Sequence, residues 1–185
     1  MTPRLVVLTD RSQLPLGRCL RVAMAVCRDA GLTHVVLREL DLQDAQREQL
    51  AADLADLGLT VIAAHRDLAA ATGLHLAADQ PAVPGVFGRS CHTPEEVARA
   101  AAEGAAWATL SPYAETGSKP GYGPPLPPDA FAGLPLPTLA LGGITAGNAA
   151  RARDSGAHGV AVMGAVMRAA DPGSVVAELL EAVAA

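Results

Sequence analysis

Short apolar runs alternate with amphipathic segments along the whole chain. The first run ends at Asp10, and the segment after it repeats apolar residues at helical spacing until Gly31. The same alternation continues to the last residues. It predicts eight strands, at about 4–10, 34–40, 59–65, 74–79, 85–91, 106–112, 136–143 and 158–164.

Helical patterns separate most of these strands. The segment 93–104 has a well-marked start, with Thr93 as the expected N-cap, Pro94 as the first helical residue and Glu96 completing a capping box. The clearest helical pattern, at 41–58, ends at a glycine, which is typical of helix C-termini. Further helices are predicted at 17–31, 148–156 and 173–185, with a short one at 66–73.

Strands that alternate with helices form parallel βαβ units, and eight such units close into a (β/α)8 barrel. We therefore expect an α/β protein with a single (β/α)8 TIM-barrel domain over residues 1–185. The chain is short for this fold, whose usual lower limit is about 200 residues. The connections at 66–73 and 80–84 are short and leave hardly any room for a helix. An open, doubly wound sheet is the alternative.

The amino-acid composition argues against some classes of binding partner. The net charge is −5, no basic run occurs and only 3% of the residues are aromatic, which argues against nucleic acid or an anionic membrane as the main partner. No apolar stretch is long enough to span a bilayer, and the first residues do not resemble a signal peptide. The three cysteines have no metal-like spacing and indicate free thiols in a cytoplasmic protein.

Polar residues gather where the predicted strands end. In a barrel the C-terminal ends of the strands meet at one face, which carries the active site. His34 and His158 lie at strand starts and are expected at the surface, whereas His75 lies inside a strand and is expected to be structural. The strand ends supply Thr9, Asp10, Arg38, Glu39, His65, Asp79, Ser90, Cys91, His92 and Ser111.

Glycines mark the ends of the last two predicted strands. Gly142 and Gly143 follow the seventh strand, and Gly164 follows the eighth. Glycine lets backbone N–H groups approach an anion closely, and a neighbouring helix N-terminus adds a favourable dipole. Because barrels often bind phosphate between these two loops, we expect a phosphate monoester site here. A tight turn without a ligand is the alternative.

The sequence resembles one known family over essentially its whole length. The segments LTD, LRE, GLHLAAD, GRSCHTPEEV, ETGSKPGYGPPL, LALGGIT and GVAVMGAV have the order and spacing of the thiamin phosphate synthase/thiazole tautomerase family. The GRSxHxxEE segment and the T-x-S-K segment are the most specific of these. The resemblance implies the barrel fold and a thiazole phosphate held by the loops after the seventh and eighth strands.

Two activities occur in that family, and one of them depends on a metal. By resemblance, the synthase joins an aminopyrimidine diphosphate to a thiazole phosphate, releases pyrophosphate and uses Mg²⁺. Leu40 stands where the family carries a cation, and Ala64 replaces a magnesium-binding Asp. Asp79 matches the second metal ligand, and Asp10 or Glu39 would have to complete the site. A divergent synthase with Mg²⁺ as its cofactor is therefore the alternative activity.

The tautomerase, by resemblance, needs no metal or other cofactor, and it is our main expectation. It moves a proton to convert a thiazole carboxylate phosphate into its aromatic tautomer. His92 is the expected acid/base, because the ordinary pKa of histidine suits proton transfer near neutral pH. Arg38 is expected to pair with the substrate carboxylate. Glu39 is expected to support Arg38 or to relay a proton, and a purely structural Arg–Glu pair is the alternative. Ser90 is expected to contact the substrate.

Lys119 is the only lysine in the chain, and it shares a Gly- and Pro-rich loop with Thr116 and Ser118. By resemblance this loop is a lid over the ligand, and a compact ammonium can follow phosphate or carboxylate oxygens at varied angles. A surface connector is the simpler alternative.

A third possibility for the whole chain is a non-catalytic phosphate-ligand binder or regulatory partner. The apolar stripe at 175–185 suits internal packing and homodimer formation equally.

Overall fold

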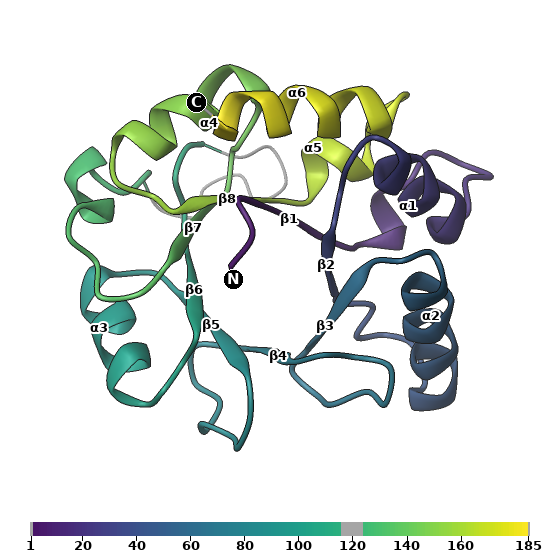
Figure 1. Cartoon of the computed structure of the whole chain (residues 1–185), viewed down its shortest axis with the longest axis horizontal. Helices are drawn as coiled ribbons and strands as arrows, with labels where there is room; N and C mark the ends of the chain where they lie inside the picture. Colours follow the sequence, from purple (N-terminus) through teal and green to yellow (C-terminus); the bar gives the residue numbers. More distant parts are fainter. Residues whose placement is uncertain (1, 116–123, 185) are drawn as a thin grey trace.

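The eight predicted strands form a closed barrel of parallel strands in sequence order (Figure 1). The computed structural model describes residues 2–115 and 124–184. Every strand lies within its predicted range but is shorter, so the (β/α)8 prediction is confirmed and the open sheet is excluded. The strands are β1 (Leu5–Leu8), β2 (His34–Leu37), β3 (Thr60–Ala64), β4 (Leu74–Leu76), β5 (Phe87–Cys91), β6 (Trp107–Leu110), β7 (Thr138–Leu141) and β8 (Gly159–Val162).

Helices surround the ring except beside β4, where loops take their place (Figure 1). The five long predicted helices are present. The structure adds a one-turn helix, α5, and two 3-10 helices that the sequence patterns did not predict. The helices are η1 (Arg11–Gln13), α1 (Leu20–Asp29), α2 (Asp44–Asp56), α3 (Pro94–Ala102), η2 (Pro128–Phe131), α4 (Ala146–Asp154), α5 (Gly164–Met167) and α6 (Pro172–Ala184).

The short helix predicted at 66–73 is wrong. This segment must return from the end of β3 to the start of β4, and it does so without a helix. The backbone N–H of Thr72 already donates to Val61 of β3, at 2.9 Å, so the last residues of the segment are extended along the barrel wall. Of the apolar residues in this segment, only Leu68 is buried, with 4% of its surface exposed. Because Thr72 and Gly73 already bond to β3, only residues 66–71 remain, which is fewer than two helical turns.

The barrel interior is filled by side chains from alternate strand positions. One cluster of buried residues, which includes Val6, Ile62, Trp107 and Leu139, lies inside the ring, while a larger cluster lies between the strands and the helices. The Trp107 ring occupies the space beside Gly88, where an added Cβ would lie 2.2 Å from the ring. Glycine is therefore required at this point of β5 because a large interior ring packs directly against the backbone.

The N-terminal segment extends from β1 over the middle of the barrel, at the end where the strands begin (Figure 1). The carbonyl of Thr2 accepts a hydrogen bond from His158 Nε2 at 2.9 Å, and Arg4 Nη1 lies 3.2 Å from His158 Nδ1. At the same end, His34 Nδ1 contacts Thr33 Oγ1 at 2.8 Å. His34 and His158 thus lie away from the strand ends that were expected to carry the chemistry.

The cysteines form no disulfide, as the sequence indicated. Cys19 is exposed, while Cys27 and Cys91 are buried. Burial raises the pKa of both buried thiols to about 12, so neither is a reactive thiolate near neutral pH. Among the described residues no helix is long and apolar enough to cross a lipid bilayer.

Candidate active site

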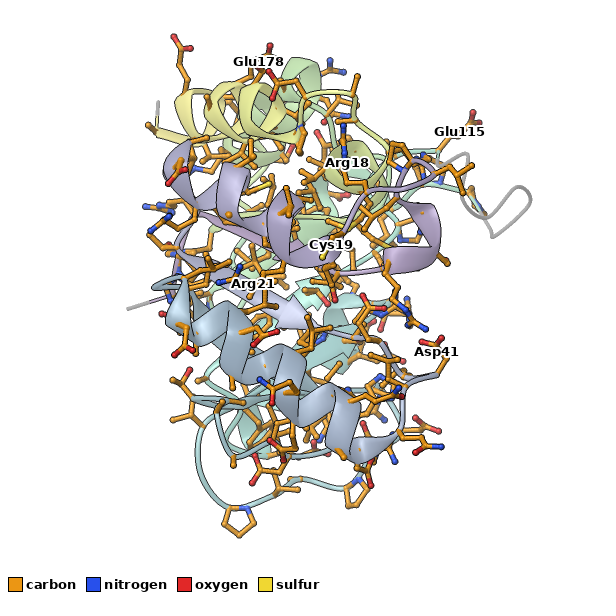
Figure 2. All side chains as sticks on the ribbon, turned by 90° about the vertical axis from the view of Figure 1, so that its right-hand side faces the viewer. Arg18, Cys19, Arg21, Asp41, Glu115 and Glu178 are labelled. Atoms are coloured by element: carbon orange, nitrogen blue, oxygen red, sulfur yellow. The ribbon has the colours of Figure 1, made fainter. Side chains whose placement is uncertain are left out.

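A cavity of about 620 Å³ lies at the C-terminal ends of the strands. Figure 2 shows the barrel from the side, with Asp41 and Glu115 at the same end of the molecule; they follow β2 and β6 respectively. The polar residues that line the cavity are Arg38, His65, His75, Asp79, Ser90, His92, Ser111, Glu115, Thr145 and Arg168, together with Gly142, Gly143 and Gly164. The expected gathering of strand ends into one site is therefore present.

The cavity brings together most of the residues that the sequence singled out. Arg38, Asp79, Ser90 and His92 line it from the ends of β2, β4 and β5, and the three glycines line it after β7 and β8. Glu39 does not line it. Thr116, Ser118 and Lys119, the three residues of the expected lid, lie outside the described residues.

Glu39 has a structural role rather than a place in the cavity. Its side chain is buried, and the carboxylate accepts hydrogen bonds from the backbone N–H of Arg11 at 3.0 Å and from Arg11 Nη1 at 3.1 Å. Arg11 also donates to both carboxylate oxygens of Asp41, at 2.7 and 2.6 Å. The expected support of Arg38 by Glu39 is therefore corrected: the partner of Glu39 is Arg11, which follows β1.

Arg38 is held in place by its backbone and not by a carboxylate. Its N–H donates to Thr9 Oγ1 at 3.1 Å, and its carbonyl accepts from Nε of the buried Arg47 at 3.2 Å. Its Nη1 lies 3.5 Å from the sulfur of Met163 at the end of β8. Within the described part of the chain no carboxylate forms an ion pair with Arg38, so its charge is available to an anion in the cavity.

His92 follows β5 and is fixed at both its backbone and its ring. Its N–H donates to Glu96 Oε2 at 2.6 Å, while Thr93 Oγ1 accepts from the N–H of Glu96 at 3.2 Å. The expected capping box is thus half formed, because the glutamate reaches back to His92 instead of Thr93. His92 Nδ1 lies 3.3 Å from the carbonyl oxygen of Ser111 and 3.2 Å from its hydroxyl. A carbonyl can only accept, so the contact with the Ser111 carbonyl favours the tautomer with the proton on Nδ1 and with Nε2 as the acceptor.

His75 forms part of the cavity floor and stays neutral. Its ring stacks on Trp107 at a centroid distance of 4.9 Å, and its Nε2 lies 3.3 Å from Thr109 Oγ1 and 3.4 Å from Ser90 Oγ. Burial, with smaller contributions from His65 and Arg38, lowers the pKa of His75 to about 3. The expectation of a structural histidine agrees with these contacts.

The buried His75 predicts a pH-dependent stability. An unfolded histidine titrates near 6.5, so below that pH the unfolded chain binds a proton that the folded chain does not take up until about pH 3. The free energy of unfolding should fall by about 1.4 kcal/mol per pH unit from this residue as the pH drops through this window. Denaturant unfolding of the wild type and His75→Phe between pH 7 and 4.5 measures it. A constant difference between the two proteins across that range would contradict the prediction.

His65 enters the cavity at a strained point of the backbone. It has φ +66°, which is uncommon for a residue other than glycine, and its N–H donates to the His75 carbonyl at 3.0 Å. Its carbonyl accepts from Gln80 Nε2 at 2.9 Å. Burial, followed by the nearby positive charge of Arg38, lowers the pKa of His65, which favours a neutral imidazole.

The glycine turn after β7 is shaped by the loop after β6. Tyr113 and Ala114 donate backbone hydrogen bonds to the carbonyls of Leu141 and Gly142, at 2.9 and 3.0 Å. Gly143 has φ +66°, and an added Cβ would lie 2.5 Å from the carbonyl oxygen of Glu115 and 2.7 Å from that of Ala114. Glycine is therefore required here for close backbone packing as well as for its positive φ.

Arg168 is a cavity residue that the sequence reading missed. It follows α5, one helical turn after Gly164, and a Cβ at Gly164 would lie 2.3 Å from its Nη1. The glycine after β8 thus leaves room for a guanidinium. The available signal was the spacing of four residues between Gly164 and Arg168, which places them on one face of a helix.

A family model described as thiamine monophosphate synthase matches residues 5–166 of the chain. The chain belongs to this family. The resemblance seen in the sequence motifs is therefore confirmed at the level of the family, while the tautomerase branch is not distinguished by the match.

Individual members of the thiamine monophosphate synthase family agree with this assignment. A thiamine-phosphate synthase of Synechocystis is 34% identical over 170 residues, or 81% of this chain, and one of Haloarcula marismortui is 31% identical over 202 residues, with 96% of each protein covered. The chain spans only half of the Synechocystis relative. Thiamine phosphate pyrophosphorylase of Pyrococcus furiosus has the same fold, with a TM-score of 0.83 at 22% identity over 98% of this chain and 95% of that one.

Proposed function

We propose that the chain is an enzyme of thiamin biosynthesis that binds a thiazole phosphate in the cavity at the C-terminal ends of the strands. The family assignment supports the class of substrate. The glycine turn after β7 leads into α4, whose N-cap Thr145 lines the cavity, so backbone N–H groups and a helix N-terminus face the expected phosphate position.

The reaction that the cavity residues support best is a proton transfer that converts a non-aromatic thiazole tautomer into the aromatic one. The observation that carries this proposal is the placement of His92, whose ring lines the cavity and whose Nδ1 contacts the Ser111 carbonyl, an arrangement that favours Nε2 as the base. In the proposed step, Nε2 removes a proton from one ring atom of the non-aromatic tautomer. The resulting imidazolium then returns a proton to the exocyclic carbon whose double bond moves into the ring, so the product is aromatic and the reaction is an isomerisation without net gain or loss of atoms.

Arg38 completes the proposed site for a substrate that carries both a carboxylate and a phosphate. Its guanidinium has no carboxylate partner among the described residues, and a planar guanidinium matches a substrate carboxylate with two parallel hydrogen bonds. Positive charge beside the carboxylate also stabilises the electron density that develops in the ring when the proton leaves. We therefore assign Arg38 to substrate binding beside His92.

Thiamin phosphate synthase is the second candidate, and the names of the curated relatives favour it over the tautomerase. Asp79 is a carboxylate that lines the cavity, as this reaction would require. Within the described residues, however, no three His, Cys, Asp or Glu side chains gather closely enough to hold a metal ion, and Ala63 and Ala64 occupy the end of β3. Mg²⁺ is usually held by one or two carboxylates together with substrate phosphate oxygens and water, so a synthase reaction here would hold it through Asp79 and the diphosphate.

Two assays on the purified chain distinguish the candidates. The first incubates the non-aromatic thiazole carboxylate phosphate in D₂O, and the tautomerase proposal predicts enzyme-dependent deuterium incorporation that is insensitive to EDTA. The second supplies aminopyrimidine diphosphate and thiazole phosphate with or without Mg²⁺ and measures pyrophosphate. Pyrophosphate release that requires Mg²⁺, without deuterium incorporation in the first assay, would replace the tautomerase by the synthase.

A further inference from the structure

The cavity contains a second guanidinium that has no carboxylate partner among the residues with described positions, and it lies on the side where the phosphate is expected. Arg168 lines the cavity together with Gly164, and its Nη1 contacts the position that a Cβ on Gly164 would occupy. No ion pair involving Arg168 occurs in the described part of the chain. Arg168 differs in this respect from Arg11 and Arg89, which both pair with glutamates.

An amide, and not a carboxylate, holds this guanidinium. Arg168 Nη1 donates a short hydrogen bond to Gln13 Oε1, while Gln13 Nε2 donates to Asp10 Oδ2 at 2.7 Å. The acceptor Asp10 fixes the orientation of the amide, because a carboxylate requires the NH₂ group on its side. Gln13 therefore separates Asp10 from Arg168, so the guanidinium is oriented by a neutral group and keeps its full positive charge.

The carboxylate of Asp10 is occupied elsewhere. It accepts from the backbone N–H and the hydroxyl of Ser12, at 3.1 and 2.5 Å, in addition to Gln13. Burial alone would raise the pKa of Asp10, but the hydrogen bonds from Ser12 and Gln13 lower it below its ordinary value. Asp10 is thus a charged anchor for the loop after β1 rather than a counterion for Arg168.

The same network reaches Arg38, the other cavity guanidinium that lacks a carboxylate partner in the described part of the chain. Gln13 Nε2 lies 3.2 Å from the sulfur of Met163, and Arg38 Nη1 lies 3.5 Å from the same sulfur. Met163 stands at the end of β8 between the two arginines. Two guanidiniums in one cavity, each with no carboxylate partner among the described residues, suit a ligand with two separate anionic groups.

We propose that Arg168 binds the phosphate group of the substrate and that Gln13 positions it for this role. The proposal rests on the proposed function, because it assigns a cation to the phosphate end of the same ligand and leaves Arg38 to the other anionic group. The guanidinium then supplies charge-assisted hydrogen bonds where the glycine turns alone supply only backbone N–H groups.

Calorimetric titration with a thiazole phosphate ester and with its dephosphorylated alcohol tests the assignment. Arg168→Ala should weaken binding of the ester by about 10- to 100-fold and leave binding of the alcohol unchanged. Arg168→Lys should retain part of the affinity. Arg21→Ala is the matched control, since Arg21 is an exposed arginine of α1 (Figure 2), and it should bind the ester as the wild type does.

Two further variants test the geometry without removing the arginine. Gly164→Ala should displace the guanidinium and weaken ester binding in the wild-type background, with a smaller effect in the Arg168→Ala background. Gln13→Glu should weaken ester binding, because the new carboxylate would form an ion pair with Arg168. Gln13→Met should weaken ester binding less, because it adds no carboxylate to compete with the phosphate for Arg168.

The outcomes separate this inference from the proposed function. Equal ester affinity of the wild type and Arg168→Ala would overturn the inference and leave the phosphate site intact. A wild type that binds the ester no better than the alcohol would overturn both. Identical effects of Gly164→Ala in the two backgrounds would show that the glycine acts independently of Arg168 and would contradict the geometric argument.

Discussion

His92→Ala should reduce the rate of proton transfer by about 10²- to 10⁴-fold, the usual contribution of a general acid/base. The loss is expected in kcat, because His92 contributes to the proton transfer while Arg38 and the phosphate contacts hold the substrate. Deuterium incorporation into the thiazole carboxylate phosphate, measured by NMR at saturating substrate, gives this rate. The ester should still bind with an affinity close to that of the wild type.

His34→Ala is the matched control for this experiment. His34 begins β2, at the opposite end of the barrel, and contacts Thr33 instead of the cavity. The His34→Ala variant should catalyse deuterium incorporation into the substrate at the wild-type rate. Unchanged activity in His92→Ala would remove the proposed mechanism, while retained ester binding in that variant would preserve the assignment of the phosphate site.

Gly143→Ala should both destabilise the protein and impair ligand binding. Alanine at φ +66° costs about 1–3 kcal/mol by itself. Its Cβ would also lie 2.5 and 2.7 Å from two backbone carbonyl oxygens of the loop after β6, which cannot move as a flexible side chain can. The two loops should therefore separate, and the affinity for the thiazole phosphate ester should fall by at least about 10-fold. Thermal unfolding and calorimetric titration measure the two effects.

Gly133→Ala provides the control for backbone strain. Gly133 has φ +64°, nearly the same as Gly143, but an added Cβ there would meet no atom within 4 Å. This variant should show the cost of strain without the contact with the β6 loop. If Gly143→Ala and Gly133→Ala lose the same stability and both bind the ester normally, the close packing of the two loops does not shape the site.

Hydrogen bonds from Arg47 connect the ends of β2 and β3 to α2. Arg47 of α2 is fully buried, and its Nη2 donates to the carbonyls of Leu37 and Ala64 at 3.0 and 2.5 Å. Burial lowers the pKa of its guanidinium, but a buried arginine remains charged near neutral pH. Since the same side chain also bonds the carbonyl of Arg38, the helix outside the barrel positions a residue of the cavity.

The sequence by itself determined the fold and the general place of the chemistry. Regular alternation of apolar runs with helical patterns requires parallel strands, and parallel strands place their C-terminal ends at one face. Arg38 and His92 could therefore be assigned to one cavity although 54 positions separate them. The segment 66–73 does not form the predicted helix, because its last two residues already bond to β3 and too few remain for two helical turns.

Only the tertiary structure decided which charged groups are paired. Glu39 immediately follows Arg38, yet its carboxylate turns to Arg11, which lies 28 positions away. Arg168 comes near the end of the chain, and its orientation depends on Gln13, 155 positions earlier. Local patterns cannot reveal such contacts, because β1 and β8 become neighbours only when the barrel closes. Closure of the ring thus brings together in one cavity two guanidiniums that have no carboxylate partner among the described residues.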